Sequence, residues 1–257
     1  GNVPYKSIKQ LIQPYPPEKH PLIIQAILLY YAGFLQFRIS DVPETEEYLN
    51  QVNSVVSELS LAPLSSTLVW DLSGVRPVNY PQRRIAAISY FLSRYTTASV
   101  SMTDELISLF NSGDRPEVIS RKLQQMFYIS GQGYWGNHYN FTAQPMPKPI
   151  ALIGRARASE IIINVIIPCA LLYAMRREDS RLIPIVMMIV RELPPPPDNY
   201  IALFMKYRLF KMNKDRYGQI VNTALRQQGL IQIFNDFCHN DKAGCESCVL
   251  PNHLAAN

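Results

Sequence analysis

Apolar residues recur at every third or fourth position along most of this chain, which is the period of an amphipathic α-helix. The first clear stretch runs from Leu22 to Phe34, and the preceding His20-Pro21 is typical of a helix start. The same spacing predicts further helices over residues 43–59, 83–94, 103–110, 114–127, 156–175, 182–192, 199–211 and 214–237. Because no stretch alternates apolar and polar residues over the length of a strand, we predict an all-α fold, an irregular multi-helix bundle of about ten helices.

Two stretches interrupt the helical pattern, at residues 62–81 and 128–150. The second is rich in glycine and aromatic residues, and aromatic side chains favour burial over the solvation that a flexible linker needs. We therefore expect one helical domain. Its parts are lobes over 1–130 and 151–237 and a cysteine-bearing tail over 238–257, all within the domain 1–257.

The composition is that of a folded, globular chain. Of the 257 residues, 47% are hydrophobic and 18% are charged, whereas a disordered chain would have fewer apolar residues and more charge. The formal net charge of +5 and the isoelectric point near 9.0 permit an anionic partner such as nucleic acid. Because the basic residues are spread along the chain rather than gathered in one stripe, a solvated, mildly basic surface is the alternative.

The sequence shows neither a secretory leader nor a membrane span. Residues 1–9 lack an apolar core. The longest apolar stretch, 161–175, is shorter than the roughly 20 residues that cross a bilayer, and it contains Asn164 and Pro168. We expect it to be a buried helix in which Cys169 is a small core residue. The expected location is the cytoplasm, with no membrane partner.

Three cysteines lie close together near the C-terminus, as Cys238-x6-Cys245-x2-Cys248. A C-x2-C turn brings two sulfurs to the same side of a metal ion, and His239 or His253 could complete a tetrahedral zinc site. An iron–sulfur cluster is the less favoured cofactor, because a histidine stands where a fourth cysteine would be expected. The alternative is that the three cysteines are ordinary thiols.

A proline-bound loop carries the first group of candidate ligand-binding arginines, Arg76, Arg83 and Arg84. The prolines could hold the guanidinium groups in place for a phosphate or a carboxylate. Equally, arginines in such a loop often donate to the carbonyl ends of neighbouring helices. The sequence leaves both interpretations open.

The second group consists of Arg155 and Arg157, at a predicted helix start. Cations oppose the helix dipole there, so we expect either an anionic ligand or an acidic partner such as Glu160. Gly154 would allow a phosphate to approach the backbone closely, but one glycine is a weak phosphate-loop signal.

The aromatic loop at 134–139 adds two candidate binding residues, Trp135 and His138. Exposed aromatic rings stack on bases in proteins that bind single-stranded nucleic acid, whereas buried ones fill a seam between lobes. His138 has the chemistry of a general base. No serine or cysteine with an orienting acid accompanies it at a recognisable spacing, so we assign no catalytic residue.

Several of these segments together resemble a known family. They are WDLSGVRPVNYPQRRI at 70–85, QGYWGNHY at 132–139, ALIGRARASEIIINVIIP at 151–168 and the ending from Arg226 through Cys248. In this order they are similar to the C-terminal helical part of domain-of-unknown-function family 2851, a group of bacterial proteins. The similarity extends from about Pro21 to Cys248.

The resemblance implies a helical companion within a larger protein rather than a complete enzyme. Longer members of the family carry an N-terminal half whose acidic motifs resemble a PD-(D/E)XK nuclease core, and no such Asp/Glu-x-Lys cluster occurs here. We therefore expect a non-catalytic module that binds nucleic acid beside such a half, with that half as its partner. The alternative is a structural or protein-interaction domain whose C-terminal tail is held by a metal.

Overall fold

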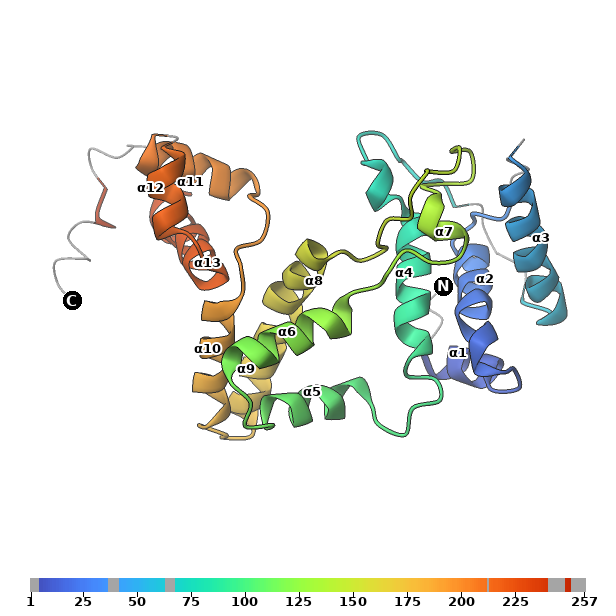
Figure 1. The fold of residues 1–257 in the computed structure, drawn as a ribbon, viewed down its shortest axis with the longest axis horizontal. Coiled ribbons are helices and arrows are strands. Elements are labelled where there is room, and N and C mark those ends of the chain that lie inside the picture. The colour runs from blue at the N-terminus through green and yellow to red at the C-terminus, as the bar shows by residue number, and fades with distance from the viewer. Residues whose placement is uncertain (1–4, 37–41, 63–67, 212, 240–247, 251–257) are drawn as a thin grey trace. The chain divides into compact units, whose positions relative to one another are not determined.

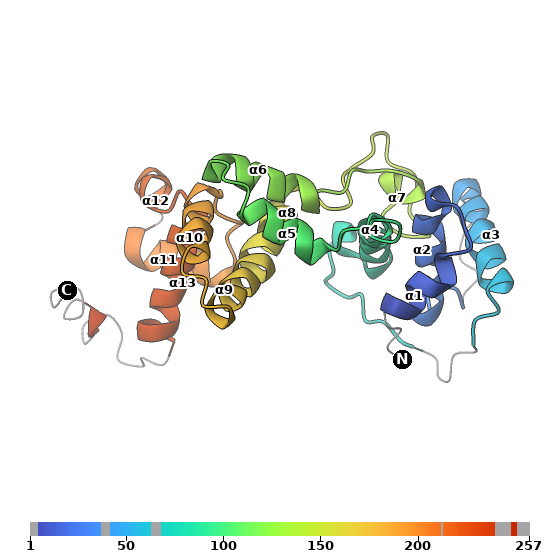
Figure 2. The ribbon, with the colours of Figure 1, turned by 90° about the horizontal axis from the view of Figure 1, so that it is seen from below.

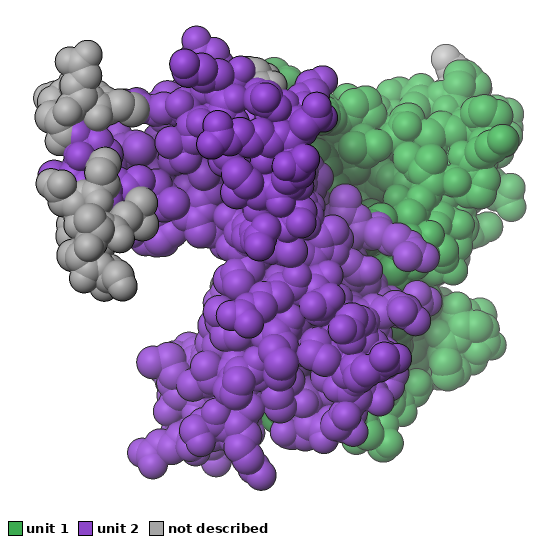
Figure 3. All heavy atoms as spheres, turned by 60° about the vertical axis from the view of Figure 1, so that its left-hand side comes forward, with its two compact units in different colours: residues 1–107, 127–154 green, residues 108–126, 155–257 purple. Residues whose placement is uncertain are grey.

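The structure is a computed structural model, and it describes residues 5–36, 42–62, 68–211, 213–239 and 248–250. The chain forms two compact units, which Figure 3 colours separately. Unit 1 comprises Gly1–Ile107 and Phe127–Gly154, and unit 2 comprises Ser108–Met126 and Arg155–Asn257. These units differ from the expected lobes, because the middle of the chain contributes one segment to unit 2 and the aromatic loop to unit 1.

Unit 1 is mainly helical (Figure 1). Its helices are α1 (Tyr5–Ile12), α2 (His20–Tyr31), α3 (Pro43–Glu58), α4 (Pro81–Ser93) and the short α7 (Tyr134–Asn137), with 3-10 turns η1 (Pro17–Lys19) and η2 (Pro77–Asn79). Two further helices, α5 (Met102–Phe110) and α6 (Pro116–Phe127), contain residues of both units. Proline is the first residue of α3, α4 and α6, where its missing N–H costs no helical hydrogen bond.

Helix α2 is central in unit 1 and lies against α1, α3 and α4 (Figures 1 and 2). It is apolar around most of its circumference because neighbours cover it on several sides. Ile24, Ala26, Ile27 and Leu29 are each 0% exposed. The helix ends just before Gly33, whose φ of 75° lies in the left-handed region that favours glycine.

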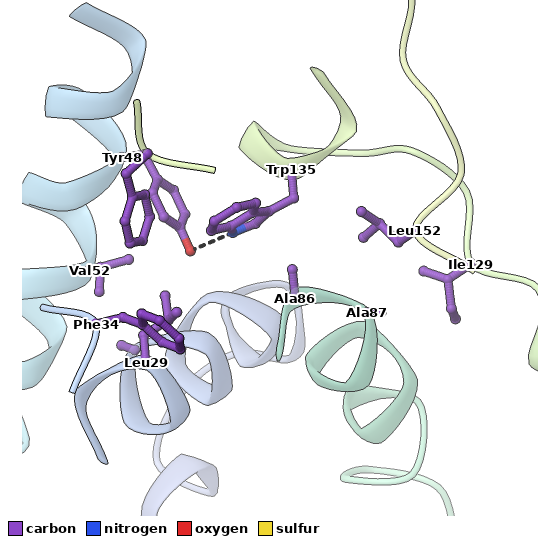
Figure 4. Close-up of a cluster of buried hydrophobic side chains, with 11 residues drawn as sticks. Leu29, Phe34, Tyr48, Val52, Ala86, Ala87, Ile129, Trp135 and Leu152 are labelled. Atoms are coloured by element: carbon purple, nitrogen blue, oxygen red, sulfur yellow. Dashed lines mark hydrogen bonds between the residues drawn. The ribbon is translucent and has the colours of Figure 1, made fainter. Parts of the chain in front are cut away.

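Buried side chains from both segments of unit 1 meet in one core (Figure 4). Members from the first segment are Ala26, Leu29, Phe34, Tyr48, Val52, Ala86 and Ala87, and members from the second are Ile129, Trp135, Phe141 and Leu152. An antiparallel bridge between Ile129 and Ile153 closes the base of the aromatic loop. The core therefore forms only when the two segments come together.

Unit 2 is mainly helical in its described part. Its elements are α8 (Arg155–Ile161), a π-helical turn η3 (Ile162–Ile166), α9 (Ile167–Arg176), α10 (Leu182–Glu192), α11 (Tyr200–Phe210), α12 (Lys214–Ile220), α13 (Ala224–Ile233) and a second π-helical turn η4 (Phe234–Cys238). Most of α6 joins them, and the Gln124 amide donates to the Ser159 hydroxyl at 3.0 Å.

The elements α8, η3 and α9 form one continuous helix from Arg155 to Arg176, here called the long helix. Pro168 is the second residue after the π turn, where the altered hydrogen-bond register accommodates a residue without an N–H. The helix buries one face through residues such as Ala158, Ile162 and Ala174.

The opposite face of the long helix is apolar and exposed. Val165 is 51% exposed, Leu172 is 50% exposed and Met175 is 68% exposed, so the expectation of a buried helix is met on one face only. Cys169 is exposed, and its assignment to the core is wrong because it lies one turn from Leu172 and Val165 on this face. By length and composition alone the long helix could cross a membrane, and 44% of its most apolar part is buried within the protein.

The predicted all-α class is confirmed, since the part of the chain that the structure describes contains no strand beyond the isolated bridge.

The prediction of a single helix over 214–237 is wrong, because the helix is interrupted between α12 and α13. Thr223 starts the second helix by accepting a hydrogen bond from the Arg226 N–H at 3.3 Å. The Ala224 N–H donates outside the helix, to Leu193 O at 2.8 Å. Apolar spacing continues across this break, so periodicity could not reveal it.

Candidate functional site

The binding residues predicted from the sequence are divided between the two units. Unit 1 contains Arg76, Arg83, Arg84, Trp135 and His138, and unit 2 contains Arg155, Arg157 and the cysteine tail. The candidate binding residues of unit 1 and those of unit 2 therefore belong to separate parts of the fold.

Arg83 is the most buried of the candidate arginines, at 0% exposed. From α4 its two terminal nitrogens donate to four main-chain carbonyls: Trp135 O, His138 O at 2.8 Å, Ile150 O at 2.9 Å and Ala151 O at 3.3 Å. Burial lowers its pKa from the ordinary arginine value. These contacts point the guanidinium into the aromatic loop and leave it no exposed edge for a phosphate.

Arg84 and Arg76 have different surroundings. The Arg84 guanidinium donates to Leu152 O at 3.2 Å and to the side-chain oxygen of Asn79, so it also holds the loop that closes unit 1. Arg76 lies just before η2 and is exposed. Of these three arginines, Arg76 alone is exposed, since Arg84 is half-buried and Arg83 is buried.

Trp135 is 1% exposed and takes part in a chain of buried hydrogen bonds. Its indole N–H donates to the Tyr48 hydroxyl at 2.9 Å (Figure 4), and that hydroxyl donates to Gln25 Oε1 at 2.8 Å. Burial raises the pKa of Tyr48 above its ordinary value. With its ring and its N–H both inside the core, Trp135 presents no face on which a base could stack.

His138 is 3% exposed, and its ring lies parallel to Tyr134 with 4.0 Å between the ring centroids. Its Nδ1–H donates to Tyr134 O at 2.9 Å, while Nε2 has no hydrogen-bond partner among the described residues. The Tyr134 hydroxyl donates to Asn140 O at 3.0 Å and lies 2.8 Å from the Thr45 hydroxyl. Burial raises the pKa of Tyr134 to about 12. The imidazole is thus a packed part of the loop.

Arg155 and Arg157 begin the long helix and are exposed. Arg157 forms an ion pair with Glu160 one turn later, which is the acidic partner suggested by the sequence. Such exposed pairs contribute little to stability, so this one leaves Arg157 available to an anion. Arg155 makes no side-chain hydrogen bond or ion pair within the described residues.

The cysteine tail is described in part. Cys238 ends η4 and packs against the apolar cluster around Met205, and the His239 ring contacts the edge of the Phe234 ring. Cys245 and His253 lie outside the described residues. No group of three or more His, Cys, Asp or Glu that could hold a metal ion occurs in the part of the tail and the units that the structure describes. The zinc site therefore stays a prediction.

The sequence analysis did not identify two exposed tyrosines as candidate binding residues. Tyr200 is 78% exposed and Tyr207 is 69% exposed, both on α11. Their spacing of seven residues places them on one face of the helix, and that spacing could have identified them. The apolar residues between them made α11 indistinguishable from a core helix.

Comparison with known proteins identifies the family and nothing finer. A family model described as "Protein of unknown function (DUF2851)" matches residues 3–199, which confirms the resemblance to this family. The ending from Arg226 through Cys248 lies outside the matched residues, and its assignment to the C-terminal part of the family stays a prediction. No curated protein and no solved structure matches the chain. The match includes α1 through α10 and ends before α11. Because the matched stretch is well over half of the sequence, the chain belongs to the DUF2851 family.

Proposed function

We propose that this chain is a non-catalytic helical module that binds nucleic acid through unit 2. The observation that carries the proposal is the distribution of charge. In unit 1 the lysines and arginines balance the aspartates and glutamates, so the whole formal net charge of +5 lies in unit 2. The net charge along the sequence does not show this difference between the units, because unit 2 is assembled from two separate stretches.

Exposed side chains provide that charge. Arg155, Arg157, Arg176 and Arg191 are all exposed on the helices of unit 2. Cations on a surface attract the phosphate backbone and release its condensed counterions, a gain that does not depend on base sequence. Unit 2 is thus the part of the chain that suits a polyanion.

The same geometry restricts what unit 1 contributes. Arg83, Trp135 and His138 are used in folding the aromatic loop, so the proposal assigns them no contact with a ligand. The ring of His138, the candidate general base, stacks against the ring of Tyr134. Unit 1 therefore acts as a scaffold in this proposal.

A binding assay with two charge reversals tests the idea. Arg155→Glu combined with Arg157→Glu should weaken binding of a labelled oligonucleotide and reduce the dependence of affinity on salt. For duplex DNA the logarithmic slope should fall by about 0.9 for each phosphate that is no longer neutralised. Lys19→Glu is the matched control, because Lys19 is an exposed cation of unit 1. Unchanged affinity in the double variant, or an equal loss of affinity in the control, would overturn the proposal.

One observation favours a second candidate, a protein-interaction domain. A surface helix ordinarily turns polar residues to solvent, whereas the long helix exposes Val165, Leu172 and Met175. We propose the N-terminal half of longer family members as the protein that covers this face. Leu172→Glu should abolish co-elution of the chain with a separately produced N-terminal half, and co-elution that survives the substitution would exclude this face as the contact.

A further inference from the structure

Helix α11 has one buried face and one face that no described residue of unit 2 covers. Ala202 and Met205 are 0% exposed and anchor the helix against the rest of the unit. On the other side Tyr200 is 78% exposed, Leu203 is 47% exposed and Tyr207 is 69% exposed. We call Tyr200, Leu203 and Tyr207 the tyrosine face.

Helix geometry fixes the arrangement of this face. Residues seven apart are two turns apart and separated by about 10 Å along the axis, with the i+3 residue between them. Tyr200 and Tyr207 therefore present two rings from the same side of a rigid element. Neither hydroxyl donates to or accepts from a described residue.

Positive charge continues directly from the tyrosine face. Lys211 is the C-cap residue directly after α11, and its N–H donates to Tyr207 O at 2.9 Å, which places it one turn beyond that tyrosine. Lys214 and Arg216 follow in the first turn of α12, with Asp215 as the single acidic residue among them. These three cations are exposed, and none makes a side-chain hydrogen bond or ion pair with a described residue.

The two cations within α11, unlike Lys211, Lys214 and Arg216, make contacts inside unit 2. Lys206 pairs with Asp198 at 3.2 Å and lies 4.1 Å from the centre of the Tyr217 ring. Arg208 lies over the Phe204 ring, 5.5 Å from its centre. Around α11, the charge that is open to a ligand therefore lies at the C-terminal end of the helix and at the start of α12.

We infer that the tyrosine face, with Lys211, Lys214 and Arg216, binds single-stranded nucleic acid. Exposed aromatic rings stack on bases irrespective of their identity, and adjacent cations neutralise the phosphates between them. Unpaired bases offer the ring faces that stacking needs, whereas a duplex keeps them covered. The inference rests on the proposed function and names its ligand and its surface. The family match ends at residue 199, so family membership contributes nothing to it.

The test measures fluorescence anisotropy of a labelled oligothymidylate mixed with the whole chain at about 50 and 200 mM salt. Tyr200→Ala with Tyr207→Ala should lower the affinity by at least about tenfold, since each stacked base contributes enough for a fivefold effect or more. Tyr200→Phe with Tyr207→Phe keeps both rings and should bind as the wild type does. Tyr200→Leu with Tyr207→Leu keeps the apolar area without the aromatic face and should lose affinity as the alanine variant does.

Each outcome has one meaning. Weaker binding by the alanine and leucine variants with full binding by the phenylalanine variant supports the inference, provided that the circular dichroism spectra and melting temperatures agree. Oligothymidylate binding that depends on Arg155 and Arg157 but ignores the tyrosines overturns the inference and leaves the proposed function standing. Equal affinity for a duplex of the same length overturns the single-strand assignment. No binding by the wild type at low salt overturns both.

A membrane surface is the remaining alternative for exposed tyrosines beside lysines. Vesicles with phosphatidylserine would then bind the wild type and the leucine variant alike, while the oligothymidylate would not bind. That pattern also overturns the inference, because apolar area rather than ring stacking would carry the contact.

Discussion

The indole N–H of Trp135 donates to the hydroxyl of Tyr48 at 2.9 Å across a separation of 87 residues. Tyr48 belongs to α3 and Trp135 to α7, so this bond joins the two segments of unit 1. The hydroxyl also donates to Gln25 Oε1 on α2. A single oxygen thus connects three helices inside the core.

Tyr48→Phe should destabilise the chain although the ring is retained. The substitution leaves the buried indole N–H and the Gln25 oxygen without their shared partner, at a cost of about 1–3 kcal/mol for such unsatisfied groups. Urea unfolding followed by circular dichroism measures the change. Tyr207→Phe is the control on an exposed ring and should leave the free energy of unfolding unchanged.

Arg83→Lys should be among the most damaging substitutions that keep the charge. One ammonium group cannot reach the carbonyls of Trp135, His138, Ile150 and Ala151 that the planar guanidinium joins, so we expect a destabilisation on the order of 3 kcal/mol. The midpoint of urea unfolding measures it. Equal stability in Arg83→Lys and in the exposed control Arg76→Lys would show that the four hydrogen bonds do not hold the loop.

Gly131→Ala should disturb the aromatic loop while a second glycine tolerates the same change. A Cβ at Gly131 would collide with the carbonyl oxygen of Ile150, whereas a Cβ at the exposed, helical Gly229 would meet no atom within 4 Å. We expect Gly131→Ala to lower the melting temperature. Gly229→Ala should raise stability by about 0.5–1 kcal/mol because alanine loses less backbone entropy in a helix. A stable Gly131→Ala variant would contradict the close packing of the loop on residue 150.

Alkaline pH should unfold the chain through its buried tyrosines. Burial raises the pKa of Tyr134 to about 12, while an unfolded tyrosine titrates near 10. Between these values the folded state holds the proton that the unfolded state has released, so stability is complete below about pH 10 and falls as pH rises toward 12. Melting temperatures across this window test the direction. Tyr134→Phe should show a shallower fall, and a steeper one would contradict the assignment.

A metal in the cysteine tail would appear as zinc bound in equimolar amount to protein purified without oxygen. Chelation should then lower the melting temperature, because a metal that binds the native state alone stabilises it by linkage. Cys245→Ser should remove the zinc. Cys169→Ser, a change at an exposed thiol of the long helix, should retain it. Metal-free protein that melts as before in the presence of chelator would leave the three tail cysteines as ordinary thiols.

Local pattern was sufficient for much of the fold. The helix expected at 182–192 is α10 (Leu182–Glu192), and Pro43 begins α3 as predicted. Apolar periodicity and proline at a helix start are local properties, so the sequence displays them directly. The break at Thr223 was missed because a hydrogen bond to Leu193, distant in sequence, competes with the helical one.

The candidate site was harder to predict because burial depends on distant segments. The carbonyls that Arg83 reaches lie more than 50 residues later, so nothing near Arg83 in the sequence distinguishes it from the exposed Arg76. The uneven distribution of charge between the units could not be predicted from the sequence either. Unit 2 combines two separate stretches, so the net charge of the whole chain does not show that unit 1 is neutral and unit 2 is positive.

Each unit is assembled from two separate stretches of the chain, and this also determines the order in which the units can fold during synthesis. Ile129, Trp135, Phe141 and Leu152 complete the core of unit 1, so the ribosome must release the chain beyond residue 154 before that core can be completed. Ser108–Met126 must likewise wait for the helices that follow Arg155. The nascent chain therefore exposes incompletely buried apolar surface of both units at once, and no single cut in the gene would separate one unit from the other.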